Sequence, residues 1–413
     1  VTLRGIRDEV IIRRDALGIP VIEAQNREDL AFAIGFVMAH DRLEQMVGFT
    51  LTAQGRLAEM AGPVALDIDV YLRTLGLRRV SEQQYAQLSK ETKHYLEQFS
   101  NGVNSYLDTH RDRLPAGLRM ARYDPEPWTP LNSVDLLTLV NLSLSLNLHE
   151  EISILNIVKK IGWERAAWLV PVYPDTPLPF DEAAKLKSVH LASIDLDLDE
   201  LTRVSRKVDQ AVLSLGIAAS NNWAIAKERT QAGASILAND IHLMLSQPPM
   251  WMLMHVKSPG YDVAGIALAG LPAILFGFNG HIAWGASMVM ADTQDVYLEE
   301  LKQIDGKMHY RYQDHWLSVD ERTETFNVRG ERPIKRTIRA TYGLSLRWGA
   351  TEQDGSLDVI FEMGKSATFQ EASVHAQDIH FIHLNLVFAD KDNIGWQVTG
   401  RYPKRRAGKG LFP

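Results

Sequence analysis

The 413-residue sequence carries a net charge of −7, with 46% hydrophobic and 23% charged residues, an ordinary balance for a globular protein longer than one typical domain. The acidic balance argues against a general nucleic-acid binder, and the lack of any run of 18 apolar residues argues against a membrane span. Because the sequence contains no cysteine, disulfides, a thiol nucleophile and cysteine-ligated zinc are excluded.

The first half of the chain is predicted to be mainly helical. The first ten residues lack the apolar core of a signal peptide, and two short strands then flank an LGIP turn at residues 17–20. Apolar residues at helical spacing follow from Leu30 to Met46, and this pattern ends before Pro63. Later, leucines alternate from Leu142 to Leu148, and this period alone predicts a strand.

The second half has a different character. Residues 188–210 are acidic and then mixed in charge, with few aromatic residues, which predicts a linker or surface segment. From Ser220 onward β-type patterns dominate. The pair Asn279-Gly280 is typical of a hairpin with a type I′ turn, whose two central residues both need positive φ. The chain is therefore interpreted as a helical half, a linker and a sheet-rich half.

The segment GIAASNNWAIA (216–226) places Ser220, Asn221 and Asn222 after a run of small residues. Taken alone, the pattern favours a simple turn before a strand. The alternative is a nucleophile created by a cut before Ser220. A free α-amine, with a pKa of about 7.7–8, acts as the base for its own hydroxyl, so no histidine is required. Asn221 and Asn222 would then orient the amine and the loop through hydrogen bonds.

Motifs along nearly the whole chain resemble, in order and spacing, those of the penicillin acylase family of N-terminal nucleophile hydrolases, which includes the acyl-homoserine lactone acylases. In the first half they are RDALGIPVIEA, DLAFAIGFVMAHDRLEQM, QGRLAEMAG and EPWTP. In the second half they are SNNWAIAKERTQAGASILANDIHL, GYDVAG, GFNGHIAWG and VFADKDNIGWQVTGRYPKR. The resemblance implies an α+β fold, the αββα four-layer sandwich, made from one autoproteolysed precursor.

This resemblance also divides the chain. It implies a mainly helical small-subunit region at residues 1–187, a spacer at 188–219 and a sheet-rich part of the large subunit at 220–413. The family's large subunit extends further than Pro413, so the resemblance implies a fragment or a naturally shortened form.

The resemblance assigns the reacting groups. Ser220 matches the nucleophile at the new N-terminus, and the small Ala219 suits the tight turn of an N-to-O acyl shift. His242 matches a histidine that, in some members, helps to hold the amine of the nucleophile; the alternative is a structural histidine. Asp240 is interpreted as a turn or capping residue.

The oxyanion donors are matched only in part. Met288 and Val289 match the segment that supplies a backbone N–H to the oxyanion. The family's second donor is an asparagine side chain beyond Pro413, and Asn385 is not at that position. The loss of one oxyanion donor typically lowers kcat by roughly 10²–10³.

The resemblance further implies a structural Ca²⁺. Glu151, Asp292 and Asp295 match the calcium ligands, with the Gln294 carbonyl between the last two. Such oxygen ligands suit this hard cation, although carboxylates scattered in a sequence are usually solvated.

The same match indicates the substrate pocket. It places Leu142–Leu148 in a helix that lines the acyl pocket, and the residues of the pocket segment are Leu142, Leu144, Ser145 and Leu146. Leu243 stands where members that prefer phenylacetyl groups carry an aromatic residue. An aliphatic slot favours aliphatic acyl chains, at roughly 0.8 kcal/mol per buried CH₂.

Two other patterns are set aside. His375, His380 and His383 resemble a zinc cluster, but positions 380 and 383 of a strand would point to opposite faces. The basic run RYPKRRAGKG (401–410) is interpreted as a solvated loop.

The resemblance thus implies a periplasmic zymogen that matures by autoproteolysis and hydrolyses linear amides without a catalytic cofactor. Acyl-homoserine lactones are the favoured substrates, which would make the protein a quorum-quenching acylase. Penicillin-type β-lactam amides are the runner-up, and a non-catalytic binding protein or an unprocessed precursor stays open. The expected partners are the small acyl amide and the second subunit that cleavage creates.

Overall fold

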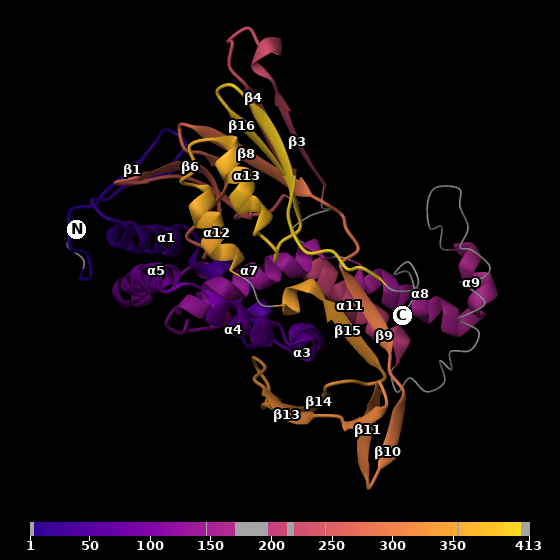
Figure 1. The fold of residues 1–413 in the computed structure, drawn as a ribbon. Coiled ribbons are helices and arrows are strands. Elements are labelled where there is room, and N and C mark those ends of the chain that lie inside the picture. The colour runs from indigo at the N-terminus through magenta and orange to yellow at the C-terminus, as the bar shows by residue number, and fades with distance from the viewer. Residues whose placement is uncertain are drawn as a thin grey trace.

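The structure, a computed structural model, describes residues 4–145, 147–169, 197–212, 219–243, 245–352 and 355–405. Helices dominate up to residue 212 and strands after it, so the fold is α+β (Figure 1). The helices are α1 (Arg27–Ala53), α2 (Ala58–Ala61), α3 (Leu66–Leu75), α4 (Leu77–Gln87), α5 (Lys90–His110), α6 (Ala116–Ala121), α7 (Pro130–Leu144), α8 (Leu148–Ile161), α9 (Trp163–Leu169), α11 (Leu198–Val212), α12 (Ser356–Met363) and α13 (Phe369–Gln377). Short 3₁₀ turns are η1 (Pro63–Ala65), η2 (Arg111–Arg113), η6 (Lys227–Arg229) and η7 (Gly349–Thr351).

The largest sheet is mixed. It has eight strands in the order β1-β2-β5-β6-β7-β8-β16-β17, in which β2 and β5 run parallel and the other neighbours antiparallel. Its strands are β1 (Ile11–Arg14), β2 (Pro20–Glu23), β5 (Trp251–Ser258), β6 (Tyr261–Leu268), β7 (Ile274–Phe278), β8 (Ile282–Met288), β16 (Leu384–Asp390) and β17 (Ile394–Val398). β1 and β2 flank the LGIP turn, as predicted.

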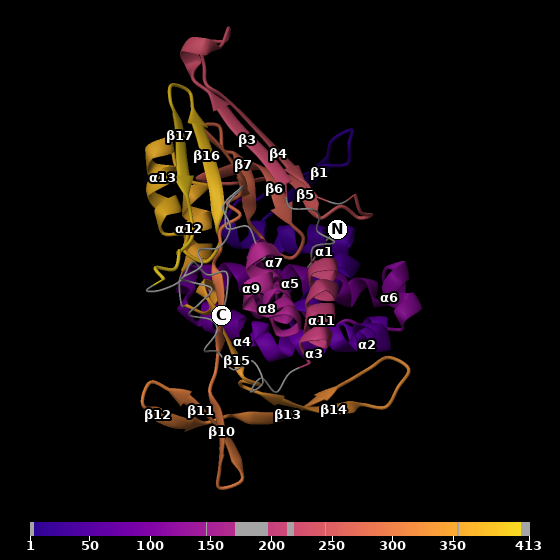
Figure 2. The same ribbon diagram turned by 90° about the vertical axis from the view of Figure 1, so that its right-hand side faces the viewer.

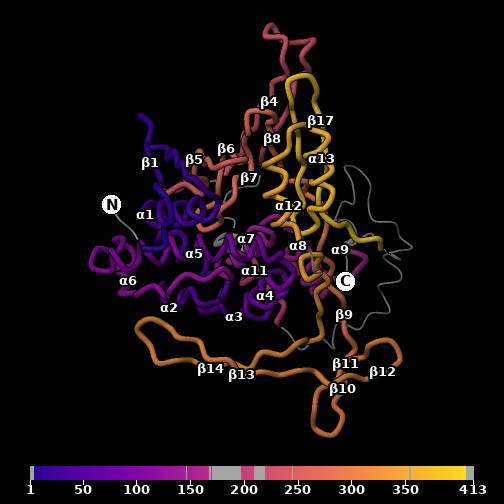
Figure 3. The backbone as a smooth tube through the Cα atoms, turned by 60° about the vertical axis from the view of Figure 1, so that its left-hand side comes forward, coloured from indigo at the N-terminus to yellow at the C-terminus, as the bar shows by residue number. Residues whose placement is uncertain are grey.

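The remaining strands form hairpins and ribbons outside this sheet. A long hairpin of β3 (Ala219–Ile225) and β4 (Ile236–His242) rises beside β16 (Figure 2). Strand β9 (Gln294–Leu298) pairs with β15 (Leu344–Trp348). Below the helices, β10 (Leu301–Ile304), β11 (Lys307–Tyr312) and β12 (His315–Ser318) form one small sheet, and β13 (Glu321–Phe326) and β14 (Ile334–Arg339) form a ribbon (Figure 3).

Helices α1 and α5 cross at very short range. A Cβ atom on Gly35 would lie 2.1 Å from the Phe99 carbonyl oxygen, and one on Gly102 would lie 1.9 Å from the Phe32 carbonyl oxygen. Only glycine allows this close approach of the two backbones. The contact forms the centre of the helical layer that supports the sheet.

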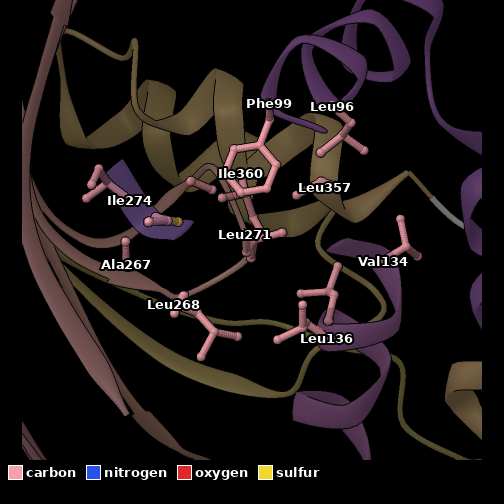
Figure 4. Close-up of a cluster of buried hydrophobic side chains, with 14 of the residues drawn as sticks. Leu96, Phe99, Val134, Leu136, Ala267, Leu268, Leu271, Ile274, Leu357 and Ile360 are labelled. Carbon is pink, nitrogen blue, oxygen red and sulfur yellow. The ribbon is translucent and has the colours of Figure 1, made fainter. Parts of the chain in front are cut away.

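The core lies where this helical layer meets the sheet. Figure 4 shows side chains from α5, α7 and α12 pointing toward those of β6 and β7 and the turn between them. The labelled residues are Leu96, Phe99, Val134, Leu136, Ala267, Leu268, Leu271, Ile274, Leu357 and Ile360. Apolar burial of this extent dominates the free energy of folding.

The long helix predicted from Leu30 to the residues before Pro63 is interrupted. Helix α1 ends at Ala53, because Gly55 adopts a φ of +62° and turns the chain into α2. A Cβ atom at Gly55 would lie 2.6 Å from Arg73 Cγ, so glycine is required on steric grounds as well.

The strand predicted from the alternating leucines 142–148 is wrong. Pro130 at the first turn and a capping box between Thr129 and Asn132 start helix α7, which continues to Leu144. The chain breaks at Ser145, and α8 begins at Leu148. Leu142 and Leu144 belong to α7, which is buried on most of its surface, so apolar residues there do not show the helical period.

The hairpin predicted at Asn279-Gly280 joins β7 to β8, but its turn is not type I′. Gly280 has a φ of +85°, whereas Asn279 is not among the residues with positive φ. The Asn279 carboxamide oxygen instead accepts hydrogen bonds from the backbone N–H groups of His281 and Ile282, both at 3.0 Å. These bonds hold the asparagine in its own Asx turn.

Part of the predicted spacer is helical. Helix α11 packs against α8 and α3, and Val204 and Val208 are buried. At its exposed side, Arg203 and Lys207 each lie 3.3 Å from the Asp67 carboxylate. The rest of residues 188–219, except Asp197 and Ala219, lies outside the described residues. The spacer boundaries therefore stay a prediction.

Within the described ranges, no single helix is both long and apolar enough to cross a membrane. Only the bent pair α7–α8 meets that test, when its two halves are counted together.

Candidate active site

Ser220 and His242 lie at the same end of the β3–β4 hairpin. Antiparallel pairing places Ser220 opposite Ile241, and Ala219 opposite His242. The Ser220 hydroxyl donates a hydrogen bond to the Ala219 carbonyl oxygen at 2.7 Å. The hydroxyl is therefore in contact with the peptide group that a cut before Ser220 would break.

His242 bonds to a carboxylate rather than to Ser220. Its Nε2 lies 2.7 Å from Asp240 Oδ2. Residues two apart on a strand project from the same face, which brings these side chains together. The interpretation of Asp240 as a turn or capping residue is thus wrong: it lies within β4 as the partner of His242.

Two asparagines fasten the hairpin to the main sheet. Asn222 donates to the Asn385 carbonyl oxygen of β16 at 2.8 Å. Asn239 donates to the Ala286 carbonyl oxygen of β8 at 2.9 Å and accepts from the Ala286 N–H at 3.0 Å. Sequence reasoning assigned Asn222 to orienting the loop and missed Asn239. The available signal was an asparagine inside a β-type run, where this residue is depleted.

Gly285 makes this fastening sterically possible. A Cβ atom there would lie 2.7 Å from the Asn239 Cβ, so we expect Gly285→Ala to push β4 off β8 and to destabilise the fold by about 1–3 kcal/mol. The melting temperature should fall, and so should the fraction of protein cut before Ser220. Gly349→Ala is the matched control, because its Cβ would meet nothing closer than 3.8 Å. Equal melting temperatures for both variants would contradict this role of Gly285.

An apolar cavity of about 100 Å³ lies beside Ser220, several times the space that one water molecule needs. Helices α7 and α12, the β3–β4 hairpin and the main sheet all contribute to its wall. The lining residues are Leu137, Val140, Ser143, Leu144, Ser220, Ile241, Leu243, Met250, Trp251, Leu268, Leu271, Leu275, Phe276, Ala286, Ser287, Met288, Ile360, Met363, Ile379, Ile382, Leu384 and Leu386. A serine hydroxyl thus meets a space that an aliphatic chain could fill.

Of the pocket residues predicted from the first half, Leu144 lines the cavity, whereas Leu142 and Ser145 do not. Leu142 is buried and does not line the cavity, and the Ser145 hydroxyl accepts from Trp348 Nε1 at 3.1 Å instead. Leu146 lies outside the described residues. On helix α7 the cavity face carries Leu137, Val140 and Leu144, spaced at three and four residues, and Leu142 points away from it.

Both predicted backbone donors lie at the end of β8. Met288 is the last residue of the strand and lines the cavity, and Val289 follows it, half-buried. Asn385 was not assigned as the second oxyanion donor, and its side-chain oxygen accepts a hydrogen bond from Trp396 Nε1 at 2.7 Å.

A cluster of three carboxylates lies elsewhere, between α8 and β9. Glu151, Asp292 and Asp295 each place an oxygen within 4.8 Å of the others. The Asn147 carboxamide joins them, bonding to Glu151 at 3.3 Å and also to Asp292 and the Gln294 carbonyl. The fold thus brings Glu151 together with Asp292 and Asp295, which lie more than 140 residues later in the sequence.

The electrostatics of this cluster favour a cation. Burial, opposed by a hydrogen bond from the Val296 N–H and reinforced by the two aspartates, raises the pKa of Glu151 to about 8. Burial also raises the pKa of Asp292 to about 6. The Arg405 guanidinium lies 2.8 Å from Asp295 and 2.9 Å from Asp292 and offsets part of the charge. Three carboxylates and a carbonyl are the oxygen donors that Ca²⁺ prefers, so the residues fit this ion.

Comparison with known proteins gives one consistent result. The family described as penicillin amidase matches residues 9–413. An acyl-homoserine lactone acylase QuiP of Pseudomonas aeruginosa is 43% identical over 100% of this chain and 51% of its own length. Penicillin acylase 2 proenzyme of Pseudomonas sp. is 28% identical over 100% of this chain and 55% of its own. A solved penicillin G acylase of Alcaligenes faecalis, 27% identical, covers 43% of this chain and 34% of its own with a TM-score of 0.38. The chain spans about half the length of the relatives it matches.

Proposed function

Because the chain belongs to the penicillin amidase family, we propose that it carries the nucleophile and acyl pocket of an amide hydrolase that acts on acyl-homoserine lactones. The observation that carries this proposal is Ser220 in the wall of an apolar cavity. Leu243 in that wall and the names of the relatives favour an aliphatic acyl chain over phenylacetyl. The proposed fold is the αββα sandwich of N-terminal nucleophile hydrolases.

The proposed chemistry begins with maturation. The Ser220 hydroxyl attacks the Ala219 carbonyl carbon in an N-to-O acyl shift, and water then hydrolyses the ester and leaves Ser220 with a free α-amine. This amine takes the proton of the same hydroxyl as it attacks the substrate carbonyl. The N–H of Met288 or Val289 donates to the oxyanion. The amine product leaves, and water releases the fatty acid.

His242 and the metal have supporting roles in this proposal. We propose that His242, which is paired with Asp240 at the hairpin end, helps to hold the new N-terminus. We propose that Glu151, Asp292, Asp295 and the Gln294 carbonyl bind a Ca²⁺ that joins α8 to β9, away from the reacting atoms. A periplasmic location and a heterodimer of the two cleaved subunits remain predictions from the family.

Product analysis tests the proposed activity. The protein that contains this chain is incubated with decanoyl-homoserine lactone, and the products are identified by liquid chromatography and mass spectrometry. We expect decanoic acid and intact homoserine lactone. Ring-opened decanoyl-homoserine would indicate a lactonase and contradict the proposal. Faster hydrolysis of penicillin G under the same conditions would favour a β-lactam acylase instead.

A further inference from the structure

A cleft lined by arginines lies where helices α3 and α4 face the β13–β14 ribbon (Figure 1). Its volume is about 600 Å³, within the range of sites that bind small molecules. Five of its described lining residues are arginines: Arg56, Arg73, Arg78, Arg79 and Arg322. It shares no described lining residue with the cavity beside Ser220, so it is a separate site.

Two of the arginines share one carboxylate. Arg73 lies 3.1 Å from Glu324, and Arg322 lies 2.5 Å from the same side chain. Arg322 uses Nε for this contact and Nη2 for the Arg73 carbonyl, which leaves Nη1 without a partner among the described residues. The Arg322 side chain is 42% exposed. One glutamate thus compensates two guanidinium groups, and an accessible donor remains.

Arg79 has no partner at all within the described part of the chain. It is exposed and forms neither a hydrogen bond nor an ion pair there through its side chain. Its Nη2 lies 3.0 Å from the position that a Cβ atom on Gly76 would take, and Gly76 belongs to the wall of the cleft. The Arg79 guanidinium therefore lies against this wall with its donors unused.

The other carboxylates around the cleft are bound to the other two arginines. These pairs are Arg56 with Glu59 and Glu126, and Arg78 with Asp135 and Glu82. None of these four carboxylates is within ion-pair distance of Arg79 or Arg322. Positive charge without a counter-ion is therefore concentrated at Arg79 and at the two arginines that share Glu324.

The start of helix α4 adds to this positive potential. Its first turn contains Arg78 and Arg79 but no acidic residue, and no side chain caps it. The N-terminus of a helix carries partial positive charge, so a cation there is unfavourable unless an anion lies nearby. Asp135 supplies that anion for Arg78, whereas Arg79 has none among the described residues.

We propose that this cleft binds a soluble phosphate compound, with Arg79 and Arg322 donating hydrogen bonds to the phosphate oxygens. The planar guanidinium group matches phosphate oxygens in geometry and stays charged at any physiological pH. The volume leaves room for a group attached to the phosphate. Because the chain as a whole carries a net charge of −7, the attraction for an anion is local to the cleft. The site does not depend on the proposed acylase activity.

Calorimetric titration tests this inference. The protein that contains this chain is titrated with glycerol 3-phosphate, inorganic phosphate and acetate at low ionic strength. We expect both phosphates to bind at one site and acetate to bind more weakly. Tighter binding of the ester would identify the natural ligand as a phosphate ester, and equal binding would identify it as free phosphate. No binding of either phosphate at millimolar concentration, or equally tight binding of acetate, would overturn the inference.

Variants locate the site. In Arg79→Gln the Kd for glycerol 3-phosphate should rise about 10-fold, the effect of one hydrogen bond to a charged group. Its melting temperature should equal that of the wild type, because Arg79 holds no other described side chain. Arg79→Lys keeps the charge without the planar fork and should fall between the two.

Arg119→Gln is the matched control, because Arg119 is an exposed arginine of α6 outside the cleft, without a side-chain partner among the described residues. It should bind the ester like the wild type. Equal weakening in Arg79→Gln and Arg119→Gln would mean that only the overall charge matters and would overturn the inference. No readout here involves amide hydrolysis, so failure of the proposed function leaves this test intact.

Discussion

Replacing Ser220 with alanine is expected to leave the protein as one uncut chain and to lower acyl-amide hydrolysis by about 10⁴-fold or more, since both reactions need the same hydroxyl. In the wild-type protein, that hydroxyl already contacts the Ala219 carbonyl. Intact mass spectrometry of the protein that contains this chain should therefore give two species, one with Ser220 as its first residue. The Ser220→Ala protein should give a single species that is heavier than either of them.

Two variants make the result specific. Ser220→Cys keeps a nucleophile at the position, so it should still be cut, although more slowly. Ser235→Ala changes a serine at the far end of the same hairpin, where the backbone N–H of Ser235 bonds to the Lys391 carbonyl at 3.1 Å, and it should be cut like the wild type. A cut before residue 220 in Ser220→Ala, or amide hydrolysis by a wild-type protein that remains uncut, would contradict the assignment.

The sequence predicted where the strands and helices of the site lie better than it predicted which side of each element faces the cavity. The hairpin around Ser220 and His242 follows from β-type patterns, and strand pairing brings its two ends together. Helix α7 shows the limit of period analysis. Its leucines are buried on most sides, so alternation suggested a strand, and the resemblance alone did not fix the helical phase. The rotation of helix α7 about its axis decides which side chains line the cavity: Leu137 and Val140 do, and Leu142 does not.

Contacts between distant segments explain what the sequence did not predict. Asn239 and Gly285 depend on each other because β4 crosses β8, and no local pattern pairs residues 46 positions apart. The same holds for Arg405, whose place beside Asp292 and Asp295 could not be read from a basic run interpreted as a solvated loop. Motifs resembling a known family supplied the proposed calcium ligands, but not Arg405, which contacts two of them.

Removing calcium is expected to lower the stability of the protein. The proposed ligands tie helix α8 to strand β9, and a ligand at 100 times its Kd stabilises the folded state by about 2.7 kcal/mol. For a chain of this size, that difference corresponds to a melting temperature lower by a few degrees. Thermal unfolding is measured with excess Ca²⁺ and with a chelator.

Glu151→Gln should lose this response to the chelator, because it removes one charged ligand while its amide oxygen still accepts from the Val296 N–H. Glu150→Gln is the matched control: the neighbouring side chain is exposed on the same helix turn and lies outside the carboxylate cluster. A chelator response that persists in Glu151→Gln would place the ion elsewhere.

Substitution of Arg405 distinguishes two ways in which the negative charge of these carboxylates can be compensated: by Ca²⁺ or by Arg405 itself. Its guanidinium contacts Asp292 and Asp295, so it offers a positive charge where a Ca²⁺ would bind. If calcium is the resident cation, Arg405→Ala removes a competitor, and the Ca²⁺ affinity measured by calorimetry should rise. If Arg405 itself is the permanent counter-ion, the variant leaves buried carboxylates uncompensated and should be destabilised with or without calcium. The two results have opposite signs in calcium-saturated buffer, so one thermal unfolding experiment distinguishes them.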